Sequence, residues 1–409
     1  GRVSLWTIGR LGRRGDGVAV GDRGRALAPL TLPGEVIEGE ATDGRISAPR
    51  IVTPSADRVR PACAHYRTCG GCSLMHASQG FTAGWKRQVV ETALAARGLP
   101  APIQGIHVSP PRSRRRAVLS GRRSKKGALV GFHARASDVI VDLADCHVLR
   151  PRITAALPLL RRIVAAGASR MGEVTINVID GPAGLDVAVA GGKPMQAELF
   201  AALAALAAEG DLARLDWDGQ TITRRSPAVP MGRAKVVPPP AAFLQATEEG
   251  EAALAAAVHD FTRGARHVAD LFAGCGTFSL RLAESAQVHA VEGLGAPLAA
   301  LDAAWRATPG LQRVTTEIRD LARNPLLADE VSRFDAIVID PPRAGAAAQA
   351  REIAASRVGR LALVACDPVN FARDARILAD GGFSLTRLLI VDQFRWSPHI
   401  ETAAEFVRR

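Results

Sequence analysis

Short runs in which apolar and polar residues alternate fill the first 55 residues, and glycines separate these runs. Alternation with a period of two is typical of half-buried strands, while Gly marks tight turns. We therefore predict five strands, at Ser4–Ile8, Gly17–Val20, Arg25–Leu30, Glu35–Glu40 and Gly44–Val52. Short strands with such turns indicate a small β-barrel of the oligonucleotide-binding kind over residues 1–55.

Residues 56–235 mix both periodicities, which predicts an α+β domain. Glu173–Ile179 and Leu185–Ala190 have the pattern of strands, and Gln196–Glu209 is an alanine-rich segment with the apolar face of a helix. Three consecutive prolines follow within Val236–Ala242. Proline cannot continue a helix or a central strand, so this segment is predicted to be a linker.

From residue 236 to 409 strands alternate with helices, the pattern of a doubly wound α/β sheet with seven strands, as in Rossmann-like domains. The strands are predicted at Arg266–Leu271, Val288–Val291, Val314–Ile318, Phe334–Ile339, Leu361–Ala365, Ser384–Val391 and Ile400–Val407. A helix is expected after each of the first five. The last two strands have only a short connection, so they should pair antiparallel.

Charge is divided unevenly between the two halves of this 409-residue chain. Residues 1–235 hold 34 basic and 19 acidic residues, a charge of +15, whereas residues 236–409 hold 18 and 21, a charge of −3. A basic half joined to a near-neutral half indicates a polyanion-binding front end, although a generally Arg-rich composition gives the same count. No run has the roughly 18–20 apolar residues of a membrane helix, and we expect a cytoplasmic protein without a membrane partner.

A glycine-rich segment follows the first strand of the C-terminal sheet. It runs from Asp270 to Thr277, contains Gly274 and Gly276, and opens a helix whose free N–H groups face a ligand site. Glu292 ends the next strand, where a carboxylate can accept from ribose hydroxyls. The spacing of these glycines differs from the GxGxxG pattern of dinucleotide-binding proteins. This difference favours S-adenosylmethionine over a nicotinamide or flavin cofactor. A tight turn without a ligand is the remaining alternative.

Three further groups follow strand ends at the same edge of the sheet. Asp340 closes the fourth strand, Cys366 closes the fifth, and Glu401 begins the last antiparallel strand. Ligands of open α/β sheets bind beyond the carboxyl ends of the parallel strands. The sequence therefore predicts that a thiol and carboxylates flank the methyl donor.

A thiol and a base are the two groups that methylation of carbon 5 of uracil requires. A thiolate adding to carbon 6 makes carbon 5 nucleophilic, and a base then removes the carbon-5 proton. Cys366 and Glu401 fit these roles. The competing interpretations are a small buried thiol for Cys366 and a solvated carboxylate for Glu401. His399 is expected to be structural or to contact RNA.

The remaining informative cysteines form a cluster. No secretory signal is evident, so disulfides are not expected, and metal ligation is the leading explanation for Cys63, Cys69, Cys72 and Cys146. Four thiolates suit a zinc ion and a 4Fe-4S cluster equally well, and free thiols are the alternative. Chemistry alone leaves zinc and iron–sulfur open.

With these motifs in hand, the chain resembles the bacterial RNA (uracil-5-)-methyltransferases, in particular the iron–sulfur branch that modifies 23S ribosomal RNA. The resemblance is carried over nearly the whole length by Ile8-Gly-Arg-Leu-Gly, Cys-x5-Cys69-Gly-Gly-Cys72, Phe243-Leu-Gln245, Ala365-Cys-Asp-Pro and His399-Ile-Glu-Thr. It implies a TRAM-type barrel at residues 1–55, a 4Fe-4S cluster on the four cysteines, and a methyltransferase domain at residues 236–409. It further implies that Cys366 is the nucleophile and Glu401 the base.

The same resemblance implies the cofactor contacts and the substrate. The residues at the family's S-adenosylmethionine positions are Gln245, Phe272, Gly274, Thr277, Glu292, Asp320 and Asp340. Members that act on transfer RNA generally lack the cysteine cluster and the N-terminal barrel, so ribosomal RNA is favoured over transfer RNA. We expect a monomer.

The chain departs from the family's pattern beside the nucleophile, where Asp367 replaces the usual Asn. A carboxylate there is expected to raise the pKa of the thiol and slow its attack. Thr277 and Asp320 also stand where many members have Asn.

Two functions compete with uracil-5 methylation. The Asp-Pro-Pro sequence at Asp340 also resembles adenine-N6 methyltransferases, which need no thiol, and a catalytically silent RNA-binding protein would keep the same fold.

Residues 112–126 carry eight positive charges and no negative one. We predict that Arg114, Arg115 and Arg116 bind RNA phosphates, against the alternative of a solvated hairpin.

Overall fold

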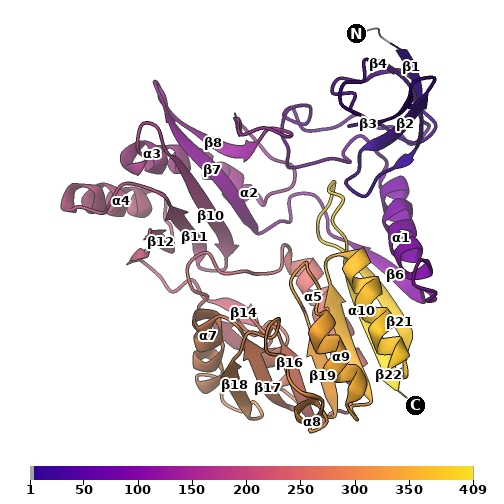
Figure 1. The fold of residues 1–409 in the computed structure, drawn as a ribbon. Coiled ribbons are helices and arrows are strands. Elements are labelled where there is room, and N and C mark those ends of the chain that lie inside the picture. The colour runs from indigo at the N-terminus through magenta and orange to yellow at the C-terminus, as the bar shows by residue number, and fades with distance from the viewer. Residues whose placement is uncertain (1–3, 409) are drawn as a thin grey trace.

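The structure is a computed structural model that describes residues 4–408. The described residues form three β-sheets of five or more strands, here called the N-terminal, middle and C-terminal sheets, and helices cover the second and third (Figure 1). No helix in the described part is long and apolar enough to cross a membrane.

The N-terminal sheet is antiparallel, with the order β3-β2-β1-β4-β5. Its strands are β1 (Ser4–Leu11), β2 (Gly17–Gly21), β3 (Gly24–Ala28), β4 (Val36–Gly39) and β5 (Arg50–Thr53). Trp6, Ile8 and Ile37 point to one side and form a small core. The segment before β5 also reaches β3, because the Ile46 amide donates to the Leu27 carbonyl at 2.8 Å. All five predicted strands are confirmed, although the last begins six residues later. A closed barrel of the TRAM type stays a prediction.

The middle sheet has seven strands in the order β13-β12-β11-β10-β7-β8-β9. Its strands are β7 (Arg116–Ser124), β8 (Gly127–His133), β9 (Ile140–Asp142), β10 (Glu173–Gly181), β11 (Gly184–Ala190), β12 (Arg214–Trp217) and β13 (Gln220–Thr223). Helices α2 (Pro151–Ala155), α3 (Leu157–Gly167) and α4 (Ala197–Glu209) accompany it, and α3 and α4 bury their apolar sides against one face. A two-stranded ribbon of β14 (Val229–Met231) and β15 (Ala234–Val236) leads to the proline segment.

The C-terminal sheet has the order β18-β17-β16-β19-β20-β22-β21-β6. Its own strands are β16 (His267–Leu271), β17 (Gln287–Glu292), β18 (Val314–Ile318), β19 (Ala336–Ile339), β20 (Arg360–Ala365), β21 (Phe383–Asp392) and β22 (Glu401–Arg408). The helices are α5 (Glu248–Phe261), α6 (Ser279–Leu282), α7 (Gly295–Arg306), α8 (Ala328–Val331), α9 (Ala347–Ala355) and α10 (Pro368–Asp380). The first five strands are parallel and β22 is antiparallel to both neighbours, as the sequence predicted.

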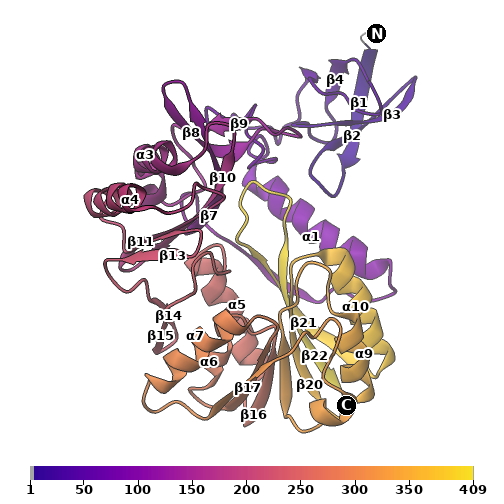
Figure 2. The same ribbon diagram turned by 60° about the vertical axis from the view of Figure 1, so that its left-hand side comes forward.

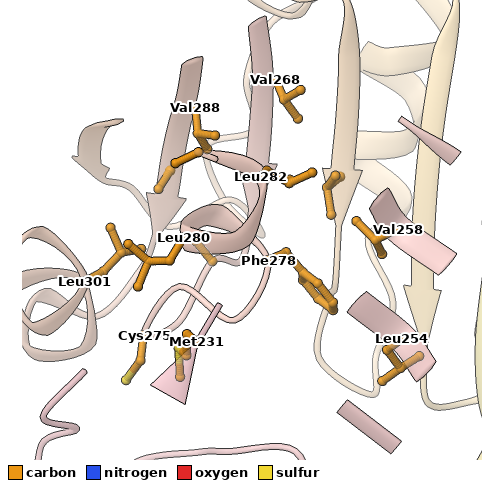
Figure 3. Packing of buried hydrophobic residues seen from close by; sticks show 14 of the residues in the cluster. Met231, Leu254, Val258, Val268, Cys275, Phe278, Leu280, Leu282, Val288 and Leu301 are labelled. Carbon is orange, nitrogen blue, oxygen red and sulfur yellow. The ribbon is translucent and has the colours of Figure 1, made fainter. Parts of the chain in front are cut away.

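Apolar residues cover both faces of this sheet because successive side chains of a strand point to opposite sides. On β19, Ala336 and Val338 face α5, α6 and α7, and Figure 3 shows the packing of this side. Ile337 and Ile339 face the opposite layer, made by α8, α9 and α10. The sheet is therefore packed on both faces between helical layers. The carboxyl ends of its parallel strands hold the residues that follow them in fixed positions.

An eighth strand joins the seven that the sequence predicted. It is β6 (Ile103–Val108), which pairs parallel with β21. The preceding helix α1 (Gln79–Ala95) packs on the same layer as α10, burying Val90 and Leu94 (Figures 1 and 2). Residues 79–108 therefore connect the segment that contains Cys63, Cys69 and Cys72 to the C-terminal sheet. The pattern of apolar and polar residues along the chain could not reveal this arrangement.

Candidate active site

The predicted nucleophile and base lie opposite each other at the edge of the C-terminal sheet. Strands β20 and β22 are antiparallel, with Ala365 paired to Thr402. Cys366 directly follows Ala365 and Glu401 directly precedes Thr402, so the pairing register brings these two residues together. Asp340 follows β19, the next strand along the sheet. The structure thus brings together the three residues that the sequence predicted there.

A chain of side-chain contacts links the two carboxylates. The Gln393 amide donates to Glu401 Oε2 at 3.0 Å and to Gln245 Oε1 at 2.7 Å. The Gln245 amide in turn donates to Asp340 Oδ2 at 3.5 Å. Each glutamine is almost fully buried, and hydrogen bonds in such an interior hold the two carboxylates strongly. Gln245 is one of the residues that the resemblance assigns to the cofactor, and that role stays a prediction, whereas Gln393 was not predicted.

The site is electrostatically unusual. Burial raises the pKa of Glu401 to about 7. Burial also raises the pKa of Asp340 well above its usual value, and the neighbouring Glu401 and Asp270 add to that rise. The pKa of the Cys366 thiol is raised to about 11, first by burial and then by these carboxylates, while Arg343 opposes the rise. Closely spaced, buried carboxylates favour a cation or a proton between them.

Asp367 caps the helix that begins beside the thiol. Its Oδ1 accepts from the amides of Val369 and Asn370 at 3.0 and 2.9 Å. Its Oδ2 lies 3.4 Å from the Arg13 guanidinium, which reaches across from the turn after β1, and 3.7 Å from that of Arg343. This carboxylate is one of the groups that raise the pKa of Cys366, as the sequence predicts, and its effect on the rate of attack stays a prediction.

The glycine-rich segment forms a turn with several residues in the left-handed region. Phe272, Gly274 and Gly276 have φ values of 61°, 56° and 96°. A phenylalanine in this conformation is strained, and such strain is concentrated at ligand-binding sites. Glu292 is held beside the turn, since its Oε2 accepts from the Gly274 amide at 2.9 Å and its Oε1 from the Leu294 amide at 3.1 Å.

The other two predicted cofactor residues lie further out. Thr277 is half-buried at the end of the glycine-rich turn, where its carbonyl accepts from Arg281. Asp320 follows β18 and is exposed, with its carboxylate accepting from the Ala322 amide at 3.1 Å. The Asp320 backbone lies beside Gly293, the residue after Glu292. Both therefore border the turn, and Asp320 remains open to solvent.

The donor set matches S-adenosylmethionine in chemistry. Glu292 offers a carboxylate at a strand end for ribose hydroxyls, and the turn at Gly274 leaves open space where a side chain would stand. The raised pKa of the buried Asp340 means that its carboxyl group would be ionised most readily with a cation beside it, and the sulfonium of S-adenosylmethionine is such a cation.

The four clustered cysteines carry free thiols, and they are close enough to influence one another. The pKa of the Cys72 thiol is raised to about 12, first by burial and then by the other three thiols. However, within residues 4–408 no group of three or more His, Cys, Asp or Glu side chains is arranged to hold a metal ion. The predicted metal-binding group is therefore not confirmed by this structure.

The basic segment 112–126 differs from its prediction. Arg115 is buried and pairs with the buried Glu251, while Arg116 donates to the Leu244 carbonyl. Arg114 is half-buried and its guanidinium lies over the Phe394 ring. Arg115 is therefore an internal contact rather than a phosphate ligand, while RNA binding by the half-buried Arg114 and Arg116 stays a prediction. A charge count cannot separate buried, paired arginines from exposed ones.

Sequence comparisons find related RNA methyltransferases. The profile of the tRNA (uracil-5-)-methyltransferases matches residues 307–409, the part that carries Cys366 and Glu401. A protein of Caulobacter vibrioides, named only as an RNA methyltransferase, is 43% identical over 98% of this chain and 99% of its own length. A 23S rRNA (uracil(1939)-C(5))-methyltransferase of Halomonas elongata is 33% identical over 98% of this chain and 89% of its own.

A solved structure has a similar fold over the whole chain. The tRNA (uracil-54, C5)-methyltransferase of Pyrococcus abyssi, in complex with S-adenosyl-L-homocysteine, superposes with a TM-score of 0.77 at 20% identity. The match covers 98% of this chain and 99% of that protein. All three sheets are thus part of a shared architecture.

Proposed function

Because this chain belongs to the RNA (uracil-5-)-methyltransferase family, we propose that it transfers a methyl group from S-adenosylmethionine to carbon 5 of a uridine in RNA. The observation that carries this proposal is the position of Cys366 opposite Glu401 at the carboxyl edge of the sheet. An amino-group methyltransferase needs neither a thiol nor a base in that arrangement.

Cys366 and Glu401 divide the covalent chemistry between them. The Cys366 thiolate adds to carbon 6 of the uracil, forming a carbon–sulfur bond and placing the electron pair on carbon 5 and the carbonyl. S-adenosylmethionine supplies the methyl group that carbon 5 takes up. Glu401 then accepts the carbon-5 proton, the electrons of that bond restore the ring double bond, and the thiolate leaves. This order requires Glu401 to be ionised when it acts.

The residues around the turn would hold the methyl donor. We assign Glu292 to the ribose, and Phe272 and Gly274 to the turn that faces the ligand. Asp340, with Gln245 beside it, would stand near the positive charge of the donor. Thr277 and Asp320 are proposed as further contacts at the border of the site.

Two variants test this division of labour. Cys366→Ala should abolish methyl transfer, because no bond to carbon 6 can form. Glu401→Gln should allow addition and methyl transfer but block proton removal, so a covalent protein–RNA adduct should accumulate on denaturing gels. Full turnover by Cys366→Ala would overturn the assignment of the nucleophile. A Glu401→Gln variant without adduct would overturn only that of the base.

Ribosomal RNA is the substrate we favour over transfer RNA. The relative from Halomonas elongata is named for 23S rRNA and aligns over almost the whole chain. The basic residues 1–235 offer a broad surface for single-stranded or locally opened RNA, from which the target base can leave its stack. The test gives the enzyme unmodified 23S-type fragments and unmodified tRNA transcripts. Methylation of the tRNA alone would overturn the substrate and leave the chemistry standing.

We extend the proposal to a 4Fe-4S cluster bound by the four clustered cysteines. Its support is the resemblance in their spacing and the mutual influence of four free thiols in one region. Protein purified without air should then contain about four irons per chain, and replacing Cys72 and Cys146 with Ser should remove them. Stoichiometric zinc without iron, or no metal at all, would contradict the cluster.

A further inference from the structure

The buried Lys86 contacts the segment of chain that precedes the candidate base Glu401. Lys86, on helix α1, has no exposed side-chain surface. Its ammonium donates to Asp392 Oδ1 at 2.7 Å, to the His399 carbonyl at 2.8 Å and to the Phe394 carbonyl at 3.3 Å. An ammonium group has three protons, so every donor of this lysine is used.

The three acceptors bracket the connection between β21 and β22. Asp392 is the last residue of β21, and His399 stands two residues before Glu401. Gln393, which donates to Glu401, directly follows Asp392. One side chain therefore ties both ends of residues 393–400 to a common point, immediately before the base and its hydrogen-bonding partner.

The middle of the same connection, at Arg395 and Trp396, is also held by residues from the N-terminal half of the chain. The Trp396 carbonyl accepts from the amides of Ser73 and Leu74 at 2.8 and 3.0 Å. Arg395 donates to Gln79 Oε1 at 2.9 Å. Figure 2 shows the connection between β21 and β22 rising above the sheet toward these segments. Residues 73 and 74 and the first residue of α1 thus hold the tip of the loop, and Lys86 of α1 holds its base.

Stability alone does not explain a charged group at this place. The desolvation of a buried ion pair offsets most of its Coulombic attraction, and an apolar side chain of similar volume is often equally stable. The neighbouring buried residues of α1 include Trp85, Val90 and Leu94, so an apolar residue would suit the surroundings. What an apolar side chain cannot do is fix two backbone carbonyls and a carboxylate in one geometry.

We propose that Lys86 is a positioning residue for the general base: it fixes residues 393–400 so that Gln393 and Glu401 face Cys366. This inference rests on the proposed uracil-5 chemistry, in which Glu401 removes the carbon-5 proton. Lys86 does not touch the reacting atoms and acts through the backbone that carries the base. Displacement of a catalytic group by about 1 Å can lower the rate by about 100-fold.

The test compares Lys86→Met with Arg87→Met, a matched control on the next residue of α1. Arg87 is exposed and pairs with Glu91 at 2.9 Å. Lys86→Met should lower the turnover number at least tenfold and change the KM for RNA less than twofold. It should also accumulate the covalent adduct that is expected for Glu401→Gln. Amide hydrogen exchange at residues 393–401 should become faster, and Arg87→Met should change none of these quantities.

A second variant covers the case in which Lys86→Met does not fold because Asp392 is left unpaired. Lys86→Met with Asp392→Asn removes both buried charges while the Asn oxygen can still accept from the Phe394 amide, as Asp392 does at 3.1 Å. The proposal predicts that this folded double variant keeps the slow turnover, the adduct and the fast exchange.

Two outcomes overturn the inference. One is wild-type turnover without adduct in a folded variant that lacks Lys86. The other is unchanged amide exchange at residues 393–401, which is measured without substrate. Failure of the proposed function has a different signature, since wild-type enzyme would then form no 5-methyluridine, whatever the exchange shows.

Discussion

Asp367→Asn should make the nucleophile more reactive without disturbing the fold. Asparagine caps helices as well as aspartate does, and its side-chain oxygen can accept from the amides of Val369 and Asn370. The lost ion pairs involve the exposed Arg13 and Arg343, and such pairs contribute about 0–1 kcal/mol. The substitution therefore removes a negative charge beside Cys366 at little cost in stability.

The expected change in the reactivity of Cys366 is that caused by the loss of one carboxylate charge beside the thiol. Asp367 is one of the carboxylates that raise the pKa of Cys366, and removing one partly screened charge should lower that pKa by about 0.5–1 unit. Below the pKa, the thiolate fraction then rises about three- to tenfold. A less basic thiolate is also a weaker nucleophile, which reduces the net gain in alkylation rate to about two- to threefold.

The assay is alkylation by iodoacetamide at pH 7.5, followed by mass spectrometry of the peptide that contains Cys366. Asp380→Asn is the matched control, because it removes the same charge at the far end of the same helix, where Asp380 is exposed and pairs with Arg376. An alkylation rate that is unchanged or slower in Asp367→Asn refutes the electrostatic reasoning. An equal gain in Asp380→Asn would refute its assignment to this position.

Three other perturbations have defined outcomes. Turnover should rise as the pH passes through about 7, because burial raises the pKa of Glu401 to about that value and only its ionised form accepts a proton; a rate that falls between pH 5.5 and 8.5 would contradict this. Arg115→Met leaves the buried Glu251 short of a partner and should lower the free energy of unfolding by about 3 kcal/mol in urea titrations; an unchanged value would refute the structural role. Replacing the exposed Lys125 and Lys126 with Ala should flatten the salt dependence of RNA affinity by about 1.5 units of log–log slope; an unchanged slope would mean that this hairpin turn does not contact RNA.

Much of the catalytic site could be predicted from the sequence because it depends on where strands end. The hydrophobic runs of the C-terminal unit located β19, β20 and β22, and the antiparallel last strand placed Glu401 at the same edge as Asp340 and Cys366. The turn at Gly274 and the carboxylate of Glu292 were predictable in the same way, since both follow local motifs.

The parts that sequence analysis missed depend on partners far away in the chain. Lys86 lies in a helix whose pattern gives no sign of a buried charge, and its acceptors lie 306 to 313 residues further along. β6 adds to the edge of a sheet formed by the other end of the chain, so its period of two could not show which sheet it joins. Arg115 belongs to a run of positive charges, yet Glu251 neutralises it in the interior.

The central claim is uracil-5 methylation that depends on Cys366, and nucleoside analysis tests it most directly. Wild-type protein and Cys366→Ala are each incubated with unmodified 23S-type RNA and S-adenosylmethionine carrying a labelled methyl group, and the RNA is digested to nucleosides for mass spectrometry. The account predicts label in 5-methyluridine with the wild-type protein and none with Cys366→Ala. Label in a different nucleoside, or undiminished 5-methyluridine with Cys366→Ala, would contradict it.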